Sequence, residues 1–492
     1  SALIGTSWKN PGNVRFLPVL LPERKKRKKL NSEIMTTTII FALIFFVMIG
    51  YYVYFLVVES HDVVNNDYNK RIDGYAETVV RGTIFSADGD KLAYTKTDDA
   101  GNETREYPYD ELFSHVIGIK NHGKSGLEKV YNYELLSTNV SPIQKIVDDF
   151  MNVKEKGNDV YTTLDVSLQK SATDSLGKNK GAVVIIDPES GAIKAMTSKP
   201  NYNPNTIDDI WDKLAEDTSD SRLVNRATQG KYTPGSIFKI VTTLEYMREN
   251  KNYNDFHFNC KGSTTINNVS IKCFDGHAHY SEELIDAFAY SCNSAFSTIG
   301  TELDMTKFAS TAKGLLFNEK LPVEIEYNKS EFNLSNESTT FDIMQTSIGQ
   351  GTTLVTPIHM AMIASSIANN GKLMKPYLVD KIESSDKSVV TKTENEEYAS
   401  LMTKKEAKQL QKYMRAVVEY GTGKIMAYSK YTAYGKTGTA EIDKNNNVNS
   451  WFVGYGEKDG KKIAIAVVIE DMPEGSDSAV KCVKAIFDDY FE

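Results

Sequence analysis

The chain has 492 residues, enough for two or three domains, and a formal net charge of −8 at pH 7. Its 41% hydrophobic and 25% charged residues are typical of a globular protein and exclude wholesale disorder. Eight Lys/Arg and two Asp/Glu give residues 1–58 a net charge of +6, so the remainder carries −14. Such an acidic globular part excludes nucleic acid as the main partner, because phosphate binding needs a basic surface.

A long apolar run near the N-terminus predicts a membrane-spanning helix. Residues 34–58 contain no charged side chain, and 25 residues of helix are enough to cross about 30 Å of hydrocarbon. The six cations at 24–29 predict that residues 1–33 form a basic cytoplasmic leader, with the rest of the chain outside. A cleaved signal peptide is disfavoured, because the run is too long and no small-residue cleavage site follows. We therefore expect a single-pass protein of the cell membrane.

Residues 59–157 are predicted to form a small non-catalytic α+β module. A polar helical connector is expected over 59–75. A strand over 78–85, a turn at 86–90 and a return strand over 91–94 are typical of a hairpin. A short helix is expected within 123–131. Because the module lies between the membrane helix and the motifs described below, we interpret it as a pedestal.

Residues 158–492 are predicted to form a second, larger domain. Strands are expected at 160–163, 181–187, 192–196, 432–441, 450–456 and 462–470. Helices are expected at 164–176, 236–248, 357–369 and 478–491, and the third has Thr356 as N-cap, Pro357 in its first turn and Gly371 after its end. Strands from both ends of the domain with helices between them indicate an α+β fold, one antiparallel sheet flanked by helices.

Three short motifs follow one another in this domain. They are Ser236-Ile-Phe-Lys239, Ser291-Cys-Asn293 and Lys436-Thr-Gly438. This order is typical of serine acyl transfer with a lysine beside the nucleophile. The first motif alone is weak evidence, since Ser-x-x-Lys recurs at five other places, whereas Lys-Thr-Gly occurs once. The inference therefore depends on the order of the motifs and their context.

Ser236 is the candidate nucleophile. Pro234 and Gly235 place it near the start of a helix, and Lys239, three positions later, shares its face. A serine hydroxyl needs a base to take its proton, and a lysine amine can do so only if burial or a nearby cation lowers its pKa. Lys436 is the candidate for that cation.

The second and third motifs supply the supporting groups. The hydroxyl of Ser291 is a candidate proton relay, and the amide of Asn293 is a candidate to orient a substrate carbonyl. The third motif is predicted to lie on an edge strand, where Gly438 leaves room for a peptide backbone and Thr437 and Thr439 hold a carboxylate. Taken alone, each motif is also compatible with an ordinary surface helix, loop or strand.

With these motifs the chain resembles class B penicillin-binding proteins, which are membrane-anchored peptidoglycan D,D-transpeptidases of the penicilloyl-serine transferase fold. The resemblance covers most of residues 75–492 and has a Gram-positive, clostridial character. It includes Arg81-Gly-Thr-Ile84, Gly123-x-x-Gly-Leu-Glu128, Pro200-Asn-Tyr202, Asn203-Pro-Asn205, Asn225-Arg-Ala227, Gly349-Gln-Gly351 with Thr356-Pro357, and Gly435-Lys-Thr-Gly-Thr-Ala-Glu441.

The resemblance implies a role for each candidate residue. Ser236 attacks the penultimate D-Ala carbonyl of a stem peptide and is acylated by β-lactams, and the backbone N–H groups of Ser236 and Thr439 form the oxyanion hole. Lys239 is the base and Ser291 shuttles a proton. Lys436 completes the network, and Asn293, Thr437 and Thr439 hold the peptide.

The resemblance also implies the partners, and no cofactor is needed for the chemistry. The expected partners are peptidoglycan stem peptides, β-lactam antibiotics, the cell membrane and a glycan polymerase of the SEDS type, with no nucleic acid. An alternative function is a D,D-carboxypeptidase, or a protein of the same fold that hydrolyses or senses β-lactams. Stable acylation by a β-lactam without turnover separates the transpeptidase from a hydrolase.

A cluster of cysteines and histidines surrounds the second motif. Cys260, Cys273, His279 and Cys292 are three thiols and an imidazole, a set that suits tetrahedral zinc. Their spacing is not that of a standard zinc finger, so a Cys260–Cys273 disulfide and free thiols remain alternatives. The resemblance favours a structural zinc held by these four residues, because some elongation-type and clostridial members have a comparable set. His277 and Asp275 are reserve ligands, and Cys482 is expected to be a buried core thiol.

Overall fold

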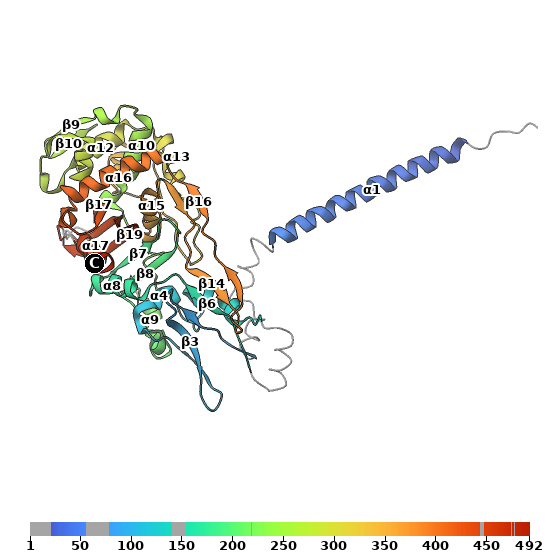
Figure 1. The fold of residues 1–492 in the computed structure, drawn as a ribbon. Helices are drawn as coiled ribbons and strands as arrows, with labels where there is room; N and C mark the ends of the chain where they lie inside the picture. Colours follow the sequence, from blue (N-terminus) through green and yellow to red (C-terminus); the bar gives the residue numbers. More distant parts are fainter. Residues whose placement is uncertain are drawn as a thin grey trace, which may run out of the picture. The chain divides into compact units, whose positions relative to one another are not determined.

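The computed structural model describes residues 21–55, 78–139, 154–217, 219–442, 447–473, 475–476 and 478–492. The chain divides into two units, Ser1–Asn69 and Lys70–Glu492, which are considered separately here (Figure 1). The predicted connector over 59–75 and the last three residues of the predicted membrane span lie outside the described residues.

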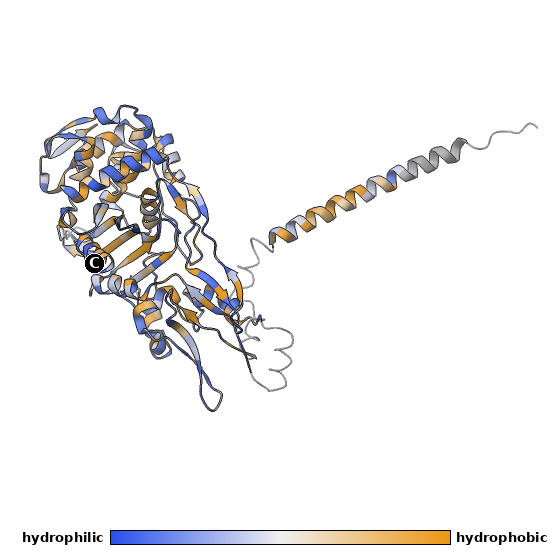
Figure 2. Ribbon diagram, in the orientation of Figure 1, coloured by the Kyte–Doolittle hydropathy of each residue, from blue (hydrophilic) through white to orange (hydrophobic). Residues whose placement is uncertain are grey.

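Helix α1 (Leu21–Tyr54) dominates the first unit. Its segment Ser32–Tyr54 has 23 residues, is strongly apolar and is not buried by any other part of the protein. Figure 2 shows hydrophobic residues along this part of the helix. In length and composition it is therefore able to cross a membrane, as expected from the sequence.

The second unit contains a five-stranded antiparallel sheet. Its strand order is β17 (Thr432–Glu441), β18 (Asn447–Lys458), β19 (Lys461–Pro473), β7 (Gly181–Ile186) and β8 (Ile193–Lys199). Strands from the two ends of the predicted domain meet where β19 pairs with β7. The predicted antiparallel sheet is therefore confirmed, and β17 is one of its edge strands.

Helices cover both faces of this sheet because side chains alternate along its strands. Val183 and Ile185 of β7 pack into a cluster with α8 (Val166–Leu176) and α17 (Ser478–Phe491). Ala182 and Val184 face the opposite cluster, which includes α10 (Lys239–Glu249), α15 (Pro357–Ala368) and α16 (Lys404–Glu419). Every residue of α15 is buried. The fold is thus a sheet between two helical layers, as expected.

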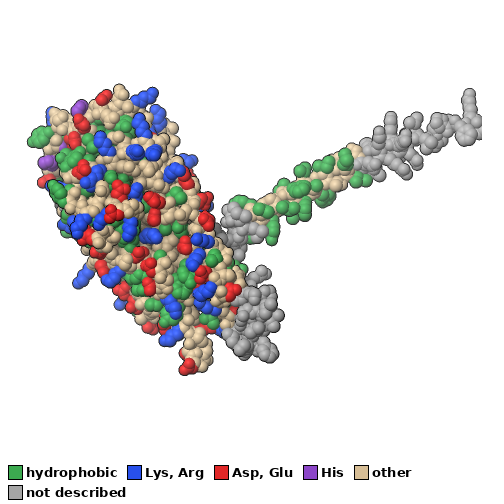
Figure 3. Space-filling model, viewed as in Figure 1, with side chains coloured by type: hydrophobic (Ala, Val, Ile, Leu, Met, Phe, Trp, Pro, Cys, Tyr) green, Lys and Arg blue, Asp and Glu red, His purple; other side chains and the backbone are tan. Residues whose placement is uncertain are grey.

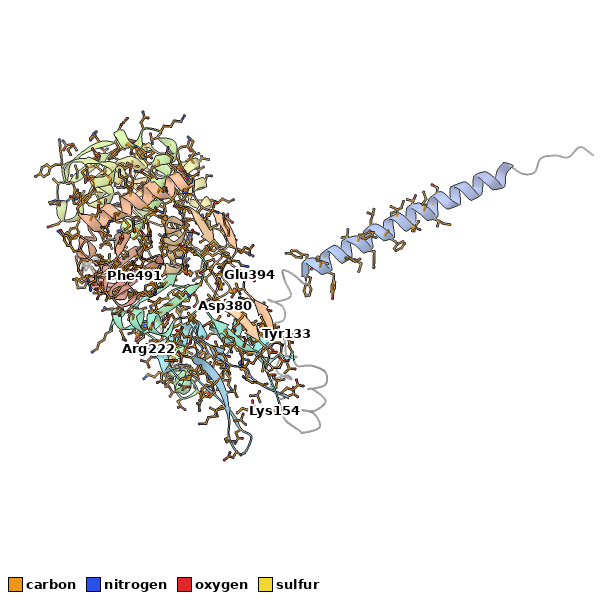
Figure 4. All side chains as sticks on the ribbon, viewed as in Figure 1. Tyr133, Lys154, Arg222, Asp380, Glu394 and Phe491 are labelled. Carbon is orange, nitrogen blue, oxygen red and sulfur yellow. The ribbon has the colours of Figure 1, made fainter. Side chains whose placement is uncertain are left out.

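A second sheet has six strands, three from the predicted pedestal and three from residues 158–492. Its order is β15 (Val389–Lys392), β14 (Val379–Glu383), β6 (Asp159–Thr162), β2 (Ile84–Phe85), β3 (Lys91–Thr97) and β4 (Glu103–Glu106). The predicted hairpin is present as β2 and β3, but β2 pairs with β6 in parallel. Asp380, labelled in Figure 4, lies on β14, a strand that the sequence did not predict.

The strand predicted over 78–85 is broken in two. β1 (Val79–Val80) pairs with β5 (Glu155–Lys156), whereas β2 joins the six-stranded sheet. Between them a Cβ atom on Gly82 would lie 1.9 Å from the carbonyl oxygen of Asn158. The backbone is therefore too close to its neighbour here for a regular strand of larger residues.

A buried ionic network fixes this break. Arg81 donates from Nε to Glu128 Oε2 at 2.6 Å, and Arg105 donates from Nε to Glu128 Oε1 at 2.7 Å. Arg81 also donates to Asn132 Oδ1 at 2.6 Å. Glu128 belongs to α5 (Gly126–Val130), the helix expected within 123–131, and has no solvent exposure. The network thereby joins α5 to the strands of the pedestal.

The remaining elements connect these two sheets or surround the catalytic motifs. They are η2 (Asp110–Phe113), α4 (Ser114–Ile117), α6 (Asn132–Leu136), η3 (Pro204–Thr206), α9 (Ile207–Glu216), η4 (Gly235–Phe238), η5 (Tyr253–Asp255), β9 (His257–Cys260), β10 (Ser263–Ile266), β11 (Val269–Lys272), η6 (Phe274–Gly276), β12 (Tyr280–Glu283), α11 (Leu284–Ala289), α12 (Asn293–Glu302), α13 (Met305–Gly314), α14 (Thr340–Ser347), β13 (Lys372–Met374), β16 (Glu397–Ser400) and η7 (Lys424–Met426). On the face shown in Figure 3, cationic and anionic side chains are interspersed.

Candidate active site

Ser236 lies in a short 3₁₀ turn, η4, that leads directly into α10. The sequence predicted an α-helix from Ser236 onward, but the α-helix begins at Lys239. In a 3₁₀ turn the side chains at positions i and i+3 eclipse one another. Ser236 and Lys239 are therefore aligned along the turn more directly than they would be on an α-helix. The Ser236 side chain is half-buried and lines a cleft.

Close backbone contacts fix the turn that carries Ser236. The N–H of Gly235 donates to Gly349 O at 2.8 Å. A Cβ atom on Gly349, at φ +82°, would lie 1.8 Å from Gly235 O, and one on Gly235, at φ +56°, would lie 2.4 Å from Thr439 O. Only glycine fits such contacts with positive φ. The 349–351 loop and β17 thus hold the turn from two sides.

Lys239 connects the first motif to the second. Its Nζ donates to Ser291 O at 2.7 Å, to Asn293 Oδ1 at 2.8 Å and to Ser291 Oγ at 3.1 Å, which matches the three donors of an ammonium group. All three acceptors are uncharged. Burial lowers the pKa of Lys239 to about 8, since desolvation disfavours the charged form.

Both ends of the Asn293 side-chain amide form hydrogen bonds. Oδ1 accepts from Lys239, and Nδ2 donates to Lys272 O at 3.1 Å. The sequence predicted that this amide orients a substrate carbonyl. In the structure this amide binds Lys239, and Asn293 also lines the cleft.

Ser291 lies in the connection between α11 and α12, where its φ of +62° is rare for a residue with a side chain. Cys292 follows as the N-cap of α12, and its Sγ accepts from the N–H of Ala295 at 3.4 Å. The Cys292 N–H donates to Ala287 O at 2.8 Å. These contacts tie the Ser291 turn to both helices and direct its hydroxyl to Lys239.

Lys436 lies on β17 and is fully buried. Its Nζ donates to Thr437 O at 3.1 Å and lies 5.6 Å from the centre of the Phe288 ring. Burial, and then the charge of Lys239, hold the pKa of Lys436 well below its usual value. For Lys239 itself, burial is the main cause of the lowered pKa. The two lysines thus form a desolvated pair of like charge.

Residues 437–439 line the cleft along the free edge of β17, as an edge strand requires. Thr437 exchanges a hydrogen bond of 2.6 Å with the Thr422 hydroxyl, and Thr439 is exposed. A Cβ atom on Gly438 would lie 2.9 Å from Ile237 Cγ2 and 3.0 Å from Pro234 O. The glycine is therefore needed for β17 to pack on the turn that carries Ser236. The sequence did not reveal this role of Gly438.

The cleft has a volume of about 420 Å³ and brings all three motifs together. Ser236, Ser291, Asn293 and residues 437–439 of β17 line it. A further part of its wall comes from the segment around the cysteine cluster and includes Phe274, His277 and Tyr290. Its contact with the edge strand β17 suits the binding of an extended peptide by addition to the sheet.

Several lining residues were not predicted from the sequence. Tyr290 immediately precedes Ser291, and Trp451 pairs with Gly438 across β17 and β18. Trp451 Nε1 donates to Thr233 O at 3.2 Å, beside the nucleophile turn. Thr422 carries no local signal. An aromatic residue next to a catalytic motif was available as a signal for Tyr290, whereas Trp451 required knowledge of the strand register.

The four candidate metal ligands also converge. One ligand atom from each of Cys260, Cys273, His279 and Cys292 lies within 4.8 Å of the others. Sγ of Cys273 is 3.6 Å from Sγ of Cys260 and 3.8 Å from Sγ of Cys292. A disulfide requires about 2.05 Å between sulfur atoms, so all four cysteines of the chain, including buried Cys482, are free thiols in this structure.

The reserve ligands lie outside this cluster. His277 and Asp275 line the active-site cleft, and the ring of His277 is 5.2 Å from that of His279. The ring of His279 stacks on Tyr290 with 6.2 Å between centroids. Cys273 and His279 themselves line the cleft, so the cluster forms part of its wall.

Comparison with known proteins identifies the class that this fold and site define. Residues 181–490 match the family model described as the penicillin-binding protein transpeptidase domain, and residues 81–160 match the penicillin-binding protein A dimerisation domain. The first match covers more than half of the chain. The chain belongs to the penicillin-binding protein transpeptidase family.

Individual relatives agree with this assignment. The peptidoglycan D,D-transpeptidase PbpA of Mycolicibacterium smegmatis is 30% identical over 420 residues, which cover 80% of this chain and 84% of that protein. The D,D-transpeptidase domain of a peptidoglycan glycosyltransferase from Eggerthella lenta is 30% identical with a TM-score of 0.75, covering 83% of this chain and 98% of that one. Penicillin-binding protein A from Mycobacterium tuberculosis, in a ceftriaxone acyl-enzyme complex, is 25% identical with a TM-score of 0.77, covering 86% and 100%.

Proposed function

We propose that the protein is a membrane-anchored serine D,D-transpeptidase that crosslinks peptidoglycan stem peptides through an acyl-enzyme on Ser236. The observation that carries this function is the buried Lys239, bonded to Ser291 and Asn293 and one turn from Ser236, beside the open edge of β17. Relatives named as peptidoglycan D,D-transpeptidases and a β-lactam acyl-enzyme of the same fold support it.

The geometry accounts for the acylation step. Neutral Lys239 takes the proton of Ser236 Oγ, which forms a bond to the penultimate D-Ala carbonyl carbon. With a pKa of about 8, roughly a tenth of the lysine is neutral at pH 7. The C–N bond then breaks, and Ser291 passes a proton to the departing amine of D-Ala. Lys436 completes this network as a second buried lysine.

Two backbone N–H groups are assigned to the developing oxyanion, those of Ser236 and Thr439. Their support is the packing of Thr439 O against Gly235, which brings the β17 backbone to the nucleophile turn. Thr437 and Thr439 hold the peptide carboxylate, and Gly438 keeps the strand close to the turn. Asn293 contacts the peptide from the opposite side of the cleft.

The test is labelling of the purified full chain with a fluorescent penicillin. The expected result is a stable label on the wild type and none on Ser236→Ala. Ser310→Ala is the matched control, because Ser310 also begins a Ser-x-x-Lys sequence but is exposed on α13. Labelling of Ser236→Ala would refute the nucleophile. Rapid release of the label as hydrolysed penicillin would favour the hydrolytic alternative.

The same proposal assigns residues 1–33 to a cytoplasmic leader, 34–58 to the membrane span, 59–157 to the pedestal and 158–492 to the transpeptidase domain. The apolar segment Ser32–Tyr54 supports the span, and the basic residues before it support a cytoplasmic N-terminus. Protease added to intact protoplasts should remove the domains after α1. Full protection of the catalytic domain would reverse the orientation.

A glycan polymerase of the SEDS type is the proposed membrane partner, bound through α1 and the pedestal. Its support is the family and the match of residues 81–160 to the penicillin-binding protein A dimerisation domain. Co-purification from detergent should be lost when α1 is replaced by an unrelated membrane helix. Retention of the polymerase after that replacement and after removal of the pedestal would contradict the proposal.

We further propose a structural zinc held by Cys260, Cys273, His279 and Cys292. With Zn–S bonds of about 2.3 Å, the sulfur atoms of a tetrahedral site lie about 3.8 Å apart, close to the 3.6 and 3.8 Å found here. Such a metal fixes Cys292, and hence its neighbours Ser291 and Asn293. It takes no part in the acyl transfer.

Metal analysis tests the zinc directly. One zinc per chain is expected in the wild type and in Cys482→Ser, whose thiol is buried elsewhere, and none in Cys260→Ser. Loss of zinc should also lower the melting temperature, because structural zinc contributes to folding. Metal-free protein with a Cys260–Cys273 disulfide by mass spectrometry would end the proposal.

A further inference from the structure

Two hollows of about 270 Å³ each adjoin one another at the pedestal. They share three lining residues, Glu103, Lys120 and Asn121. The first hollow extends from these residues to β1 and α6, and the second extends to β4 and residues 204–208. Neither contains a residue that lines the active-site cleft. The pedestal therefore offers space for a small ligand that the acyl-transfer chemistry does not use.

Positive charge predominates among the side chains that line these two hollows. The charged lining residues are the cations Arg81, Arg105, Lys120 and Lys124 and the anions Glu103 and Asp208. Glu103 Oε1 forms an ion pair of 2.7 Å with Nζ of Lys154, a residue labelled in Figure 4. Asp208 Oδ1 lies 2.7 Å from His122 Nε2. Both carboxylates are therefore already engaged by other residues.

Lys120 and Lys124 have no counterion of this kind. Both side chains are partly buried, and neither ammonium group forms an ion pair or hydrogen bond with any residue in the described ranges of the chain. Burial, and then the charge of Arg105, lower the pKa of Lys120. Lys120 is thus close enough to the guanidinium group for the two charges to repel each other. A bound anion would relieve this repulsion.

Arg105 adds a donor that is not satisfied within the protein. Its side chain is only 1% exposed. Nε and Nη1 donate to Glu128 Oε1, Gly82 O and Thr95 Oγ1, whereas Nη2 is buried and has no hydrogen-bond partner among the described residues. A buried donor without an acceptor is unfavourable, and more so when it is charged. An anionic oxygen in the hollow that Arg105 lines would supply the missing acceptor.

We propose that the two hollows form a binding site for a phosphate group, in which Lys120 and Lys124 supply two ammonium groups and Arg105 supplies a guanidinium donor. Lys120 lines both hollows, so it occupies the centre of the site. Two lysines without counterions match the nearly doubly charged phosphate monoester better than a singly charged carboxylate. A membrane lipid with a phosphate monoester headgroup and a soluble phosphate present the same chemistry. The site does not depend on the proposed transpeptidase function.

The test measures binding to the full-length protein in detergent at constant pH and ionic strength. Calorimetric titration with inorganic phosphate is one arm, and titration with dihexanoyl phosphatidic acid is the other. Acetate and dihexanoyl phosphatidylcholine are the control ligands. Lys120→Met and Lys124→Met should each weaken phosphate binding about tenfold, because each removes one charge-assisted contact. Tighter binding of the phosphatidic acid would support a lipid headgroup as the ligand, and tighter binding of inorganic phosphate would support a soluble phosphate.

Lys91→Met is the matched control, because Lys91 is an exposed lysine on β3 of the same sheet but lines neither hollow. Without ligand, all three variants should melt no earlier than the wild type. Phosphate should raise the melting temperature of the wild type and of Lys91→Met, and should raise it less in the other two variants. A wild type that binds neither phosphate compound would overturn the proposal. So would equal phosphate affinity in the wild type, Lys120→Met and Lys124→Met.

Discussion

The pedestal and the active site each bury two cationic side chains, with opposite consequences. In the pedestal, Arg81 and Arg105 share the carboxylate of Glu128. Burial would raise the pKa of Glu128, but the two guanidinium groups hold it below its usual value. In the active site, neither Lys239 nor Lys436 forms an ion pair with any described carboxylate. The two arginines of the pedestal share a carboxylate and stay charged. The two lysines have no such partner among the described residues, so their lowered pKa allows them to release protons.

The largest expected effect comes from Lys239→Arg, which keeps a cation in the active site but prevents it from losing a proton. A guanidinium group stays charged at all accessible pH values. Acylation by penicillin should therefore slow by about 10³-fold, within the range of general-base catalysis. Stopped-flow or gel labelling measures this rate. An acylation rate within tenfold of the wild type would show that the active site, like the pedestal, works with a permanently charged cation.

Glu128→Gln should leave the pedestal, like the active site, with two buried cations that share no carboxylate. It leaves two buried guanidinium groups without a carboxylate, so the free energy of unfolding should fall by about 3–5 kcal/mol. Denaturant melts of the detergent-solubilised chain measure the change. Glu326→Gln is the matched control, because its ion pair with Lys129 is solvent-exposed and should contribute about 0–1 kcal/mol. Equal destabilisation by the two variants would contradict the comparison.

Gly349→Ala tests whether acylation depends on the backbone contact that holds the turn carrying Ser236. The added methyl would lie 1.8 Å from Gly235 O, so the turn must shift at a cost of about 1–3 kcal/mol in stability. Penicillin labelling should slow as well. Gly351→Ala is the control, because its φ of +80° is equally restrictive but its nearest neighbours are 3.6 Å away. The two variants should differ in labelling rate, and identical rates would count against a role for the Gly349 contact.

The pH dependence is the smallest expected effect. The lowered pKa of Lys239, about 8, means that its neutral form increases as pH rises towards 8 and levels off above it. The acylation rate should therefore increase about tenfold between pH 7 and pH 9. The scaffold, with its carboxylate between two guanidinium groups, should show no matching change in stability. A flat rate profile over this interval would mean that Lys239 is not the base.

The sequence predicted most of the site because its motifs are local. Ser236 and Lys239 are one turn apart, and each of the other motifs is three residues long. The sequence also identified the strands at both ends of the larger domain, since their apolar runs are continuous. The four thiol and imidazole ligands were predicted from composition within 33 residues, and the structure brings them together.

Long-range pairings were not accessible in the same way. Nothing in the sequence near Val379–Glu383 indicates that this strand pairs with β6, more than 200 residues earlier. The hydrogen bond from the Gly235 N–H to Gly349 O and the packing of Gly438 on Ile237 depend on the tertiary arrangement of separate segments. Arg81, Glu128 and Arg105 were seen at most as parts of motifs, because an ion pair has no periodicity along the chain.

The free edge of β17 has a consequence for the solubility of the protein. A row of unpaired N–H and C=O groups is a template for any extended chain, including another copy of the same strand. Phe274, His277 and Tyr290 line the same cleft as residues 437–439 of that edge, which is therefore part of a concave surface. An edge covered by neighbouring side chains pairs with a folded sheet less readily than a fully open edge does. The wall that shapes the active site therefore also protects the protein from aggregation through its own sheet.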